Sequence, residues 1–169
     1  MKKLMLSLSL VAGLTSLVAC SSKDNKQPEK EQSEIVTTIE NPVTIEFWHA
    51  MAGTNQEAVE KLVADFNATV GAEKKITVKP VYQGQYTDLK TKTTAALKSG
   101  SVPAIAQAYP DWVAEYLQSG SVVDLDSYIN DGKVGIKDFD DIIKSYREEN
   151  SQYEGGKFYS LPFNKSTEV

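Results

Sequence analysis

Cysteine and histidine are nearly absent from this chain: its 169 residues include one of each, Cys20 and His49. A single cysteine cannot form an internal disulfide, even in an oxidising compartment. With one histidine and no second thiol, the common zinc ligand sets and the nucleophilic triads cannot be assembled from these residues. We therefore expect no metal site, no cofactor and no catalytic residues.

Basic residues are also scarce, with 18 lysines and arginines against 23 aspartates and glutamates. A chain that began at Cys20 would keep 16 basic against 23 acidic residues, a net charge of about −7. Nucleic acids and anionic membrane surfaces both require basic patches. The composition thus argues against nucleic acid as a partner and against membrane contact through the folded part.

Long apolar runs are absent except near the start, where Lys2 and Lys3 precede an apolar stretch from Leu4 to Ala19. This stretch is shorter than the roughly 20 residues of a lasting transmembrane helix, and it has the flanks of a secretory signal peptide. Its ending, Leu17-Val-Ala-Cys20, resembles the lipobox of bacterial lipoproteins. We expect a signal peptide over 1–19 and lipidation of Cys20; the alternative is an ordinary signal peptide with an accidental cysteine.

Residues 20–41 are polar, mixed in charge and almost free of aliphatic side chains before Ile35. Such a segment buries too little apolar surface to offset the entropy of ordering it. We interpret it as a flexible, lipidated tether, with folded structure over 42–169.

The folded part alternates strand and helix patterns, and the predicted strands are 43–48, 75–82, 104–108 and the shorter 122–125. Helices are predicted from Thr54, which opens a capping-box pattern ahead of the apolar position Val59, and over 87–99, with Leu89, Thr93, Ala96 and Leu97 inward and Gly100 at the end. Two further helices are predicted, one from Asp111 as N-cap to Gly120 and one over 139–146 with Asp138 as N-cap. A hairpin is predicted around Gly155-Gly156, followed by an apolar strand at 160–163. Strands that alternate with helices indicate an α/β fold with a mostly parallel sheet, whose ligands lie beyond the carboxyl ends of the strands.

Five segments from Ile45 onward resemble the extracellular solute-binding proteins of bacterial ABC importers, family 1, in the sugar and glycerol-phosphate branch: IEFWHAMAG (45–53), VYQGQY (81–86), SVPAIAQAY (101–109), YLQSGSVVDL (116–125) and GGKFYSLPFNKST (155–167). The resemblance implies a type II periplasmic-binding-protein-like fold of two α/β lobes that close on a ligand. It also implies that 42–169 is mainly the N-terminal lobe, truncated near the hinge. Because the sequence stops at Val169 after an apolar strand pattern, we expect a fragment that lacks the second lobe.

The same resemblance suggests ligand-binding residues. Tyr86 and Ser166 match a tyrosine and a serine that glycerol-phosphate binders place on their ligand. The glutamate of that branch aligns with Pro110 in this chain, which is a departure from the glycerol-phosphate pattern. The departure favours the sugar binders, which have an aspartate at the place of Asp111. The alternatives are that Tyr86 packs on its own lobe and that Asp111 is only a helix cap. Lys165 could meet an anionic group, although a solvated side chain is the simpler interpretation.

Three aromatic residues, Trp48, Tyr109 and Trp112, are candidates for stacking on a sugar ring. A tryptophan that ends a buried strand is more often part of the core, so Trp112 ranks first and Trp48 last.

We therefore expect a lipid-anchored, monomeric solute-binding protein that captures an oligosaccharide or related polyol and delivers it to an ABC permease. Its expected location is the outer face of the cell membrane, in a bacterium with a single membrane of the Gram-positive type. The alternatives are a binder of sn-glycerol 3-phosphate or glycerophosphodiesters, a surface-anchored hydrolase, and a sensor or adhesion lipoprotein.

Overall fold

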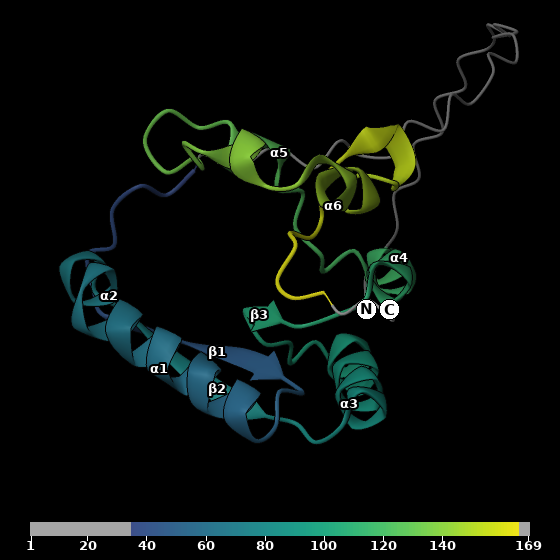
Figure 1. The fold of residues 1–169 in the computed structure, drawn as a ribbon, viewed down its shortest axis with the longest axis horizontal. Helices are drawn as coiled ribbons and strands as arrows, with labels where there is room; N and C mark the ends of the chain where they lie inside the picture. The colour runs from purple at the N-terminus through teal and green to yellow at the C-terminus, as the bar shows by residue number, and fades with distance from the viewer. Residues whose placement is uncertain (1–34, 166–169) are drawn as a thin grey trace, which may run out of the picture. The chain divides into compact units, whose positions relative to one another are not determined.

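The computed structural model describes residues 35–165, and the predicted signal peptide with Cys20 and the predicted ligand residue Ser166 lie outside this range (Figure 1). In chain order the elements are β1 (Val43–His49), α1 (Thr54–Ala68), α2 (Val70–Lys74), β2 (Ile76–Tyr82), α3 (Tyr86–Ser99), β3 (Ile105–Ala106), α4 (Pro110–Tyr116), η1 (Leu117–Ser119), α5 (Asp126–Ile129), η2 (Phe139–Asp141), α6 (Lys144–Glu149) and η3 (Glu154–Gly156). None of the helices in this part of the chain has the length and apolar character needed to cross a membrane.

The sheet of the described residues has three strands in the order β2-β1-β3, and both pairings are parallel. β1 pairs with β2 along its whole length, from Val43 opposite Ile76 to His49 opposite Tyr82. β3 pairs only through its two residues, opposite Phe47 and Trp48. The predicted α/β class with a parallel sheet flanked by helices is therefore confirmed, although the third strand is shorter than predicted.

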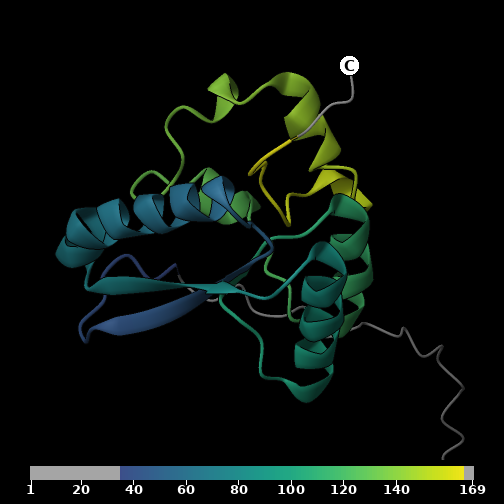
Figure 2. The ribbon, with the colours of Figure 1, turned by 60° about the horizontal axis from the view of Figure 1, so that its bottom comes forward.

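Helix α1 lies along the sheet next to β1 and β2 (Figures 1 and 2). Its buried residue is Val59, one of the apolar positions that the helical spacing predicted. In α3, Leu89, Thr93 and Ala96 are buried, as predicted, and Gly100 ends the helix with a φ of 75°. Pro80 lies in β2, an edge strand of the sheet, where a residue without a backbone N–H is tolerated.

Two predicted helix caps are wrong. Thr54 is the first helical residue of α1, and Gly53 precedes it as the N-cap with a φ of 57°. A capping arrangement of this kind occurs instead at α3, where the Gln85 amide donates a hydrogen bond to the Asp88 carboxylate at 2.9 Å. Asp111 is not an N-cap either, because α4 already begins at Pro110, whose fixed φ and missing N–H suit the first helical position.

The region after α4 is less regular than predicted. No strand forms at 122–125, because the Asp124 carboxylate accepts a hydrogen bond from the Asp126 amide at 3.1 Å and turns the chain into α5. The predicted helix over 139–146 is interrupted at Ile142 and Ile143, which are both extended, and the carbonyl oxygen of Ile142 accepts a hydrogen bond from the Arg147 side chain.

The predicted hairpin is also wrong, although its turn is present. Gly155 and Gly156 both have positive φ, and the Gly156 amide closes a turn by donating to the Tyr153 carbonyl oxygen at 2.9 Å. The flanking residues then bond elsewhere, since the Phe158 carbonyl oxygen accepts from the Leu125 amide at 2.8 Å. Residues 160–163 are likewise irregular rather than a strand.

Candidate ligand-binding site

The three strands end at the same edge of the sheet because they are parallel. The chain continuations after them remain paired for one more residue: the Gln83 amide donates to the His49 carbonyl oxygen at 2.9 Å, and the Gln107 amide to that of Trp48 at 2.8 Å. Residues directly after β1, β2 and β3 are thus brought together, as the topology predicts.

Three of the predicted ligand residues form one aromatic cluster at this edge. The ring centroids of Tyr86 and Tyr109 lie 5.2 Å apart, and that of Trp112 lies 4.9 Å from Tyr109 and 6.4 Å from Tyr86. Trp112 is buried, Tyr86 is half-buried and Tyr109 is 48% exposed. Tyr109 is therefore the ring of the cluster with the most surface available to a ligand, and Trp112 packs behind it.

A buried amide, Gln107, connects the chain segments around this cluster. Its Oε1 accepts a hydrogen bond from the Ala50 amide at 3.0 Å. Its Nε2 donates to Asn164 Oδ1 at 3.0 Å and to the Tyr86 hydroxyl at 3.3 Å. One side chain thereby holds the loop after β1, the start of α3 and the 157–165 segment, which runs back from the α6 region toward β3 (Figure 1).

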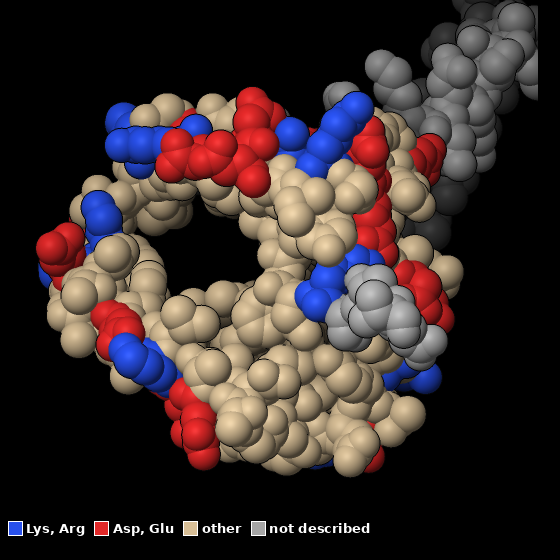
Figure 3. Space-filling model, in the orientation of Figure 1, with Lys and Arg blue, Asp and Glu red and all other residues tan. Residues whose placement is uncertain are grey.

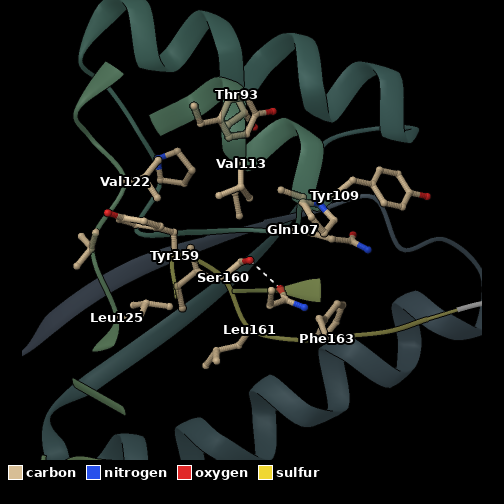
Figure 4. A pocket seen from close by; sticks show the side chains of 18 of the residues that line it. Thr93, Gln107, Tyr109, Val113, Val122, Leu125, Tyr159, Ser160, Leu161 and Phe163 are labelled. Carbon is tan, nitrogen blue, oxygen red and sulfur yellow. Dashed lines mark hydrogen bonds between the residues drawn. The ribbon is translucent and has the colours of Figure 1, made fainter. Parts of the chain in front are cut away.

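Next to the cluster lies a cavity of about 750 Å³, which Gln107 and Tyr109 line on one side and Val122 and Leu125 on the other (Figure 4). The first side is polar and aromatic, since Tyr86 and Asn164, which bind Gln107, also line the cavity. The opposite side is mainly apolar, and the ring of Tyr159 lies there with Val122 and Leu125. A sugar or polyol needs hydrogen-bonding partners as well as an apolar face, so the polar and aromatic side is the part that suits such a ligand.

Asp111 and Trp48 are not among the residues that line this cavity. Asp111 is exposed in the first turn of α4, and its carboxylate has no hydrogen bond within residues 35–165. The indole N–H of Trp48 donates to the Glu46 carboxylate at 2.9 Å, and its half-buried ring makes no contact with the aromatic cluster. Ligand roles for both residues, for Ser166 and for the three residues of the aromatic cluster stay predictions.

Charges near the site are largely paired. Lys165 lies 2.6 Å from the Glu149 carboxylate and Lys90 lies 2.9 Å from Glu115, so neither lysine is simply solvated. On the face seen in Figure 3, acidic and basic side chains are interspersed, and neither sign covers a continuous area. Within residues 35–165 no group of three or more metal-ligating side chains is present.

His49 is 1% exposed at the end of β1, and its Nδ1 accepts a hydrogen bond from the Met51 amide at 3.3 Å. Burial lowers the pKa of this imidazole below its ordinary value, although the nearby Glu60 carboxylate opposes the shift. A neutral imidazole at this position fixes the direction of the chain as it leaves β1 toward Ala50.

The sequence interpretation missed Gln107 and Asn164. Both lie inside segments that carried the family resemblance, at 101–109 and 155–167, and Gln107 directly follows a strand. The predicted strand over 104–108 included Gln107, so the available signal was a polar residue inside an otherwise apolar strand pattern. Asn164 had none, because the hydrogen bond that joins it to Gln107 spans 57 residues.

The profile of the family described as bacterial extracellular solute-binding protein matches residues 61–169 of this chain. The chain therefore belongs to this family. Curated relatives include the sn-glycerol-3-phosphate-binding periplasmic proteins of Salmonella typhimurium (29% identical over 126 residues, 75% of this chain) and Yersinia pestis (30% over 127 residues, 74% of this chain). The chain spans 28% of the length of each of these relatives.

Solved structures show the same fold. The galacto-N-biose/lacto-N-biose I-binding protein of the ABC transporter from Bifidobacterium longum matches 73% of this chain and 29% of its own, with a TM-score of 0.55 and 25% identity. The maltotriose-binding protein of Thermus thermophilus matches 70% and 28%, with a TM-score of 0.52 and 21% identity. These matches confirm the predicted periplasmic-binding-protein-like fold.

Proposed function

We propose that this protein captures a carbohydrate or polyol derivative outside the cytoplasm and delivers it to an ABC permease without chemical change. The observation that carries the proposal is the cluster of Tyr86, Tyr109 and Gln107 at the carboxyl ends of three parallel strands, in a chain of a solute-binding family. Aromatic faces pack against the apolar C–H face of a sugar ring, and the phenol and amide groups meet its oxygens.

The lobe described above supplies one wall of the ligand site in this proposal. The curated relatives are more than three times as long as the stretch that they share with this chain, which leaves room for a second lobe. Two lobes that close on a ligand would bury it between them. Binding then depends on residues of both walls, and the isolated 169-residue chain should bind any ligand weakly or not at all.

Two ligand classes are candidates. Oligosaccharides suit the exposed ring of Tyr109, and the structural relatives named above include binders of lacto-N-biose and maltotriose. sn-Glycerol 3-phosphate is favoured by the names of the curated relatives. Pro110 argues against a simple transfer of the glycerol-phosphate site, because the carboxylate expected there is displaced to Asp111.

A lipid anchor at Cys20 and a tether over 20–41 complete the proposal. An importer-linked binding protein must stay near its permease, and in a bacterium with one membrane an anchor prevents its loss to the medium. Metabolic labelling with an alkyne-tagged palmitate analogue should mark the wild-type protein and leave Cys20→Ser unlabelled. Release of the unaltered protein into the medium without lipid would contradict the anchor while leaving the binding role open.

The binding role is tested by thermal unfolding of the full-length protein, meaning the complete gene product with both lobes of this proposal, in the presence of sn-glycerol 3-phosphate, lacto-N-biose and maltotriose. A bound ligand raises the melting temperature by mass action. A ligand concentration of about 100 times the Kd adds about 2.7 kcal/mol to the free energy of unfolding. A shift with one class and none with the other identifies the ligand class. Hydrolysis of any of these compounds during the experiment would favour the surface hydrolase and contradict transport without chemistry.

A further inference from the structure

The backbone amide of Ala50 fixes the orientation of the Gln107 side chain. A backbone N–H can only donate, so the Gln107 atom that faces it at 3.0 Å must be the carbonyl oxygen Oε1. The other end of the same amide is therefore the NH₂ group, which can only donate. The assignment of oxygen and nitrogen in Gln107, which geometry alone leaves open for most amides, is settled by this one contact.

The orientation of Gln107 in turn determines what its two neighbours present. Nε2 donates to the Tyr86 hydroxyl at 3.3 Å, so the hydroxyl oxygen serves as acceptor and keeps its own hydrogen for another partner. Nε2 also donates to Asn164 at 3.0 Å, so the oxygen of that amide faces Gln107 and its NH₂ group is directed elsewhere. Within residues 35–165 neither the Tyr86 hydrogen nor the Asn164 NH₂ group has another partner.

Both of these donors are accessible from the cavity. Tyr86 and Asn164 line it together with Gln107, and Tyr86 is half-buried whereas Asn164 is exposed. In Figure 4 the Gln107 amide lies on the side of the cavity where Tyr109 and Phe163 also lie, away from the apolar side with Val122 and Leu125. The contact between Ala50 and Gln107 thus determines which hydrogen-bonding groups Tyr86 and Asn164 present to a ligand in the cavity.

We propose that Gln107 is a specificity-determining positioning residue, which makes Tyr86 and Asn164 hydrogen-bond donors and so selects a ligand that presents an oxygen acceptor to them. This inference rests on the proposed function, because it concerns the same site. A phosphate oxygen and a sugar hydroxyl or ring oxygen share this acceptor chemistry. A ligand group that can only donate, such as an ammonium, would leave both of these donors unpaired and is disfavoured at this position.

The variant Q107E tests the polarity because it keeps the shape and the Ala50 contact but replaces the donor by a carboxylate oxygen. The Tyr86 hydroxyl must then donate to that carboxylate and can no longer donate to a ligand. Q107M removes all three hydrogen bonds without reversing any of them. If Gln107 were only structural, ligand affinity would follow the melting temperature and Q107M would be the worse variant. The proposal expects Q107E to bind more weakly than Q107M although it keeps more of the native hydrogen bonds.

A double-mutant cycle removes the effect of the new negative charge on an anionic ligand, since that charge is present on both sides of the comparison. Calorimetry is carried out on the full-length protein with the compound, among sn-glycerol 3-phosphate, lacto-N-biose and maltotriose, that binds the wild type. Y86F should weaken binding about tenfold in the wild-type background, the worth of one hydrogen bond, and by less than about twofold in the Q107E background. An equal loss in both backgrounds would overturn the proposal.

A neutron structure of the deuterium-exchanged wild-type protein tests the polarity without any ligand. The proposal expects the Tyr86 hydroxyl deuterium to point away from Gln107 and two deuterium atoms on the Gln107 atom that faces Tyr86. A hydroxyl deuterium directed at Gln107 would overturn it. If none of the three compounds binds the wild type, the proposed function fails, and the neutron map still decides the polarity of Tyr86 by itself.

Discussion

The rings of Tyr109 and Trp112 stand edge to face, with their centroids 4.9 Å apart and their planes at 87°. The two residues differ in exposure, since Trp112 is 8% and Tyr109 48% exposed. Trp112 therefore supports the proposed site from inside the fold, whereas Tyr109 offers the exposed ring surface of that site.

Replacement of these two residues should affect different properties: the stability of the fold for Trp112 and ligand binding for Tyr109. Trp112→Ala removes a buried ring and should lower the free energy of unfolding by about 3–5 kcal/mol. Tyr109→Ala should change it by less than about 1 kcal/mol, yet weaken ligand binding, because the lost surface is exposed. Urea unfolding and calorimetry on both variants check this. A Tyr109→Ala protein with unchanged ligand affinity would remove Tyr109 from the site.

Because Asp111 is not a helix cap, its effect on ligand binding can be measured separately from any effect on stability. Since α4 begins at Pro110 and the Asp111 carboxylate has no hydrogen bond within residues 35–165, Asp111→Asn should change the free energy of unfolding by less than about 0.5 kcal/mol. If Asp111 binds a sugar hydroxyl, the same variant should weaken binding about tenfold, as expected for a charge-assisted hydrogen bond. Thermal unfolding and calorimetry on one preparation give both values. Loss of stability without loss of affinity would show a structural role instead.

Asn67 forms a reciprocal pair with the backbone of the edge strand β2. Its Nδ2 donates to the Val78 carbonyl oxygen at 2.9 Å, and its Oδ1 accepts from the Val78 amide at 2.8 Å. Asn67→Ala leaves both backbone groups unpaired and should cost about 1–3 kcal/mol in the free energy of unfolding. Unpaired edge strands also promote association, so the variant should elute earlier in size-exclusion chromatography.

Gln56→Ala is the matched control for Asn67→Ala, because Gln56 lies on the same helix and its side chain binds, among the residues that the structure describes, only the exposed Glu60 at 2.8 Å. This control should cost less than about 0.5 kcal/mol. Equal stability losses in the two variants would show that the contact with β2 has no special weight.

The buried His49 predicts a pH dependence of stability. Burial lowers its pKa in the folded state below the ordinary value of 6.5, so the unfolded chain takes up a proton first as the pH falls. The free energy of unfolding should therefore decrease between pH 7.5 and 5.5 and level off once the folded protein is protonated as well. His49→Asn keeps an acceptor for the Met51 amide and cannot titrate. Thermal unfolding at the two pH values should show a smaller decrease for this variant, and an equal decrease would assign the effect to other groups.

The regular first half of the folded part could be predicted from the sequence because its signals are local. The alternation of Val43–Trp48, the spacing of Leu89, Thr93 and Ala96, and the stop at Gly100 each depend on a few neighbouring residues, and the structure confirms them. The helix caps were harder to predict, because each differs from the prediction by about one residue. Gly53 rather than Thr54 caps α1, and α4 begins at Pro110, before Asp111.

The second half could not be predicted because distant contacts determine it. Lys157 pairs with Asp124, and Phe158 pairs with Leu125. These long-range contacts replace the hairpin and the strands that the local sequence patterns favour. The same holds for the site. Short motifs singled out Tyr86, Tyr109 and Trp112, which the structure brings together. The connection that Gln107 makes between Ala50 and Asn164 spans 57 residues in each direction and has no local signal.

The most direct test of the proposed site is a calorimetric titration of the full-length protein with the compound, among sn-glycerol 3-phosphate, lacto-N-biose and maltotriose, that binds it best. The variant with both Tyr86→Ala and Tyr109→Ala is compared with Tyr128→Ala, which removes a 37% exposed ring outside the cavity. We expect the double variant to lose at least about 100-fold in affinity, the worth of two ligand contacts, while Tyr128→Ala stays within about threefold of the wild type. Wild-type affinity in the double variant would contradict a ligand site at the carboxyl ends of these strands.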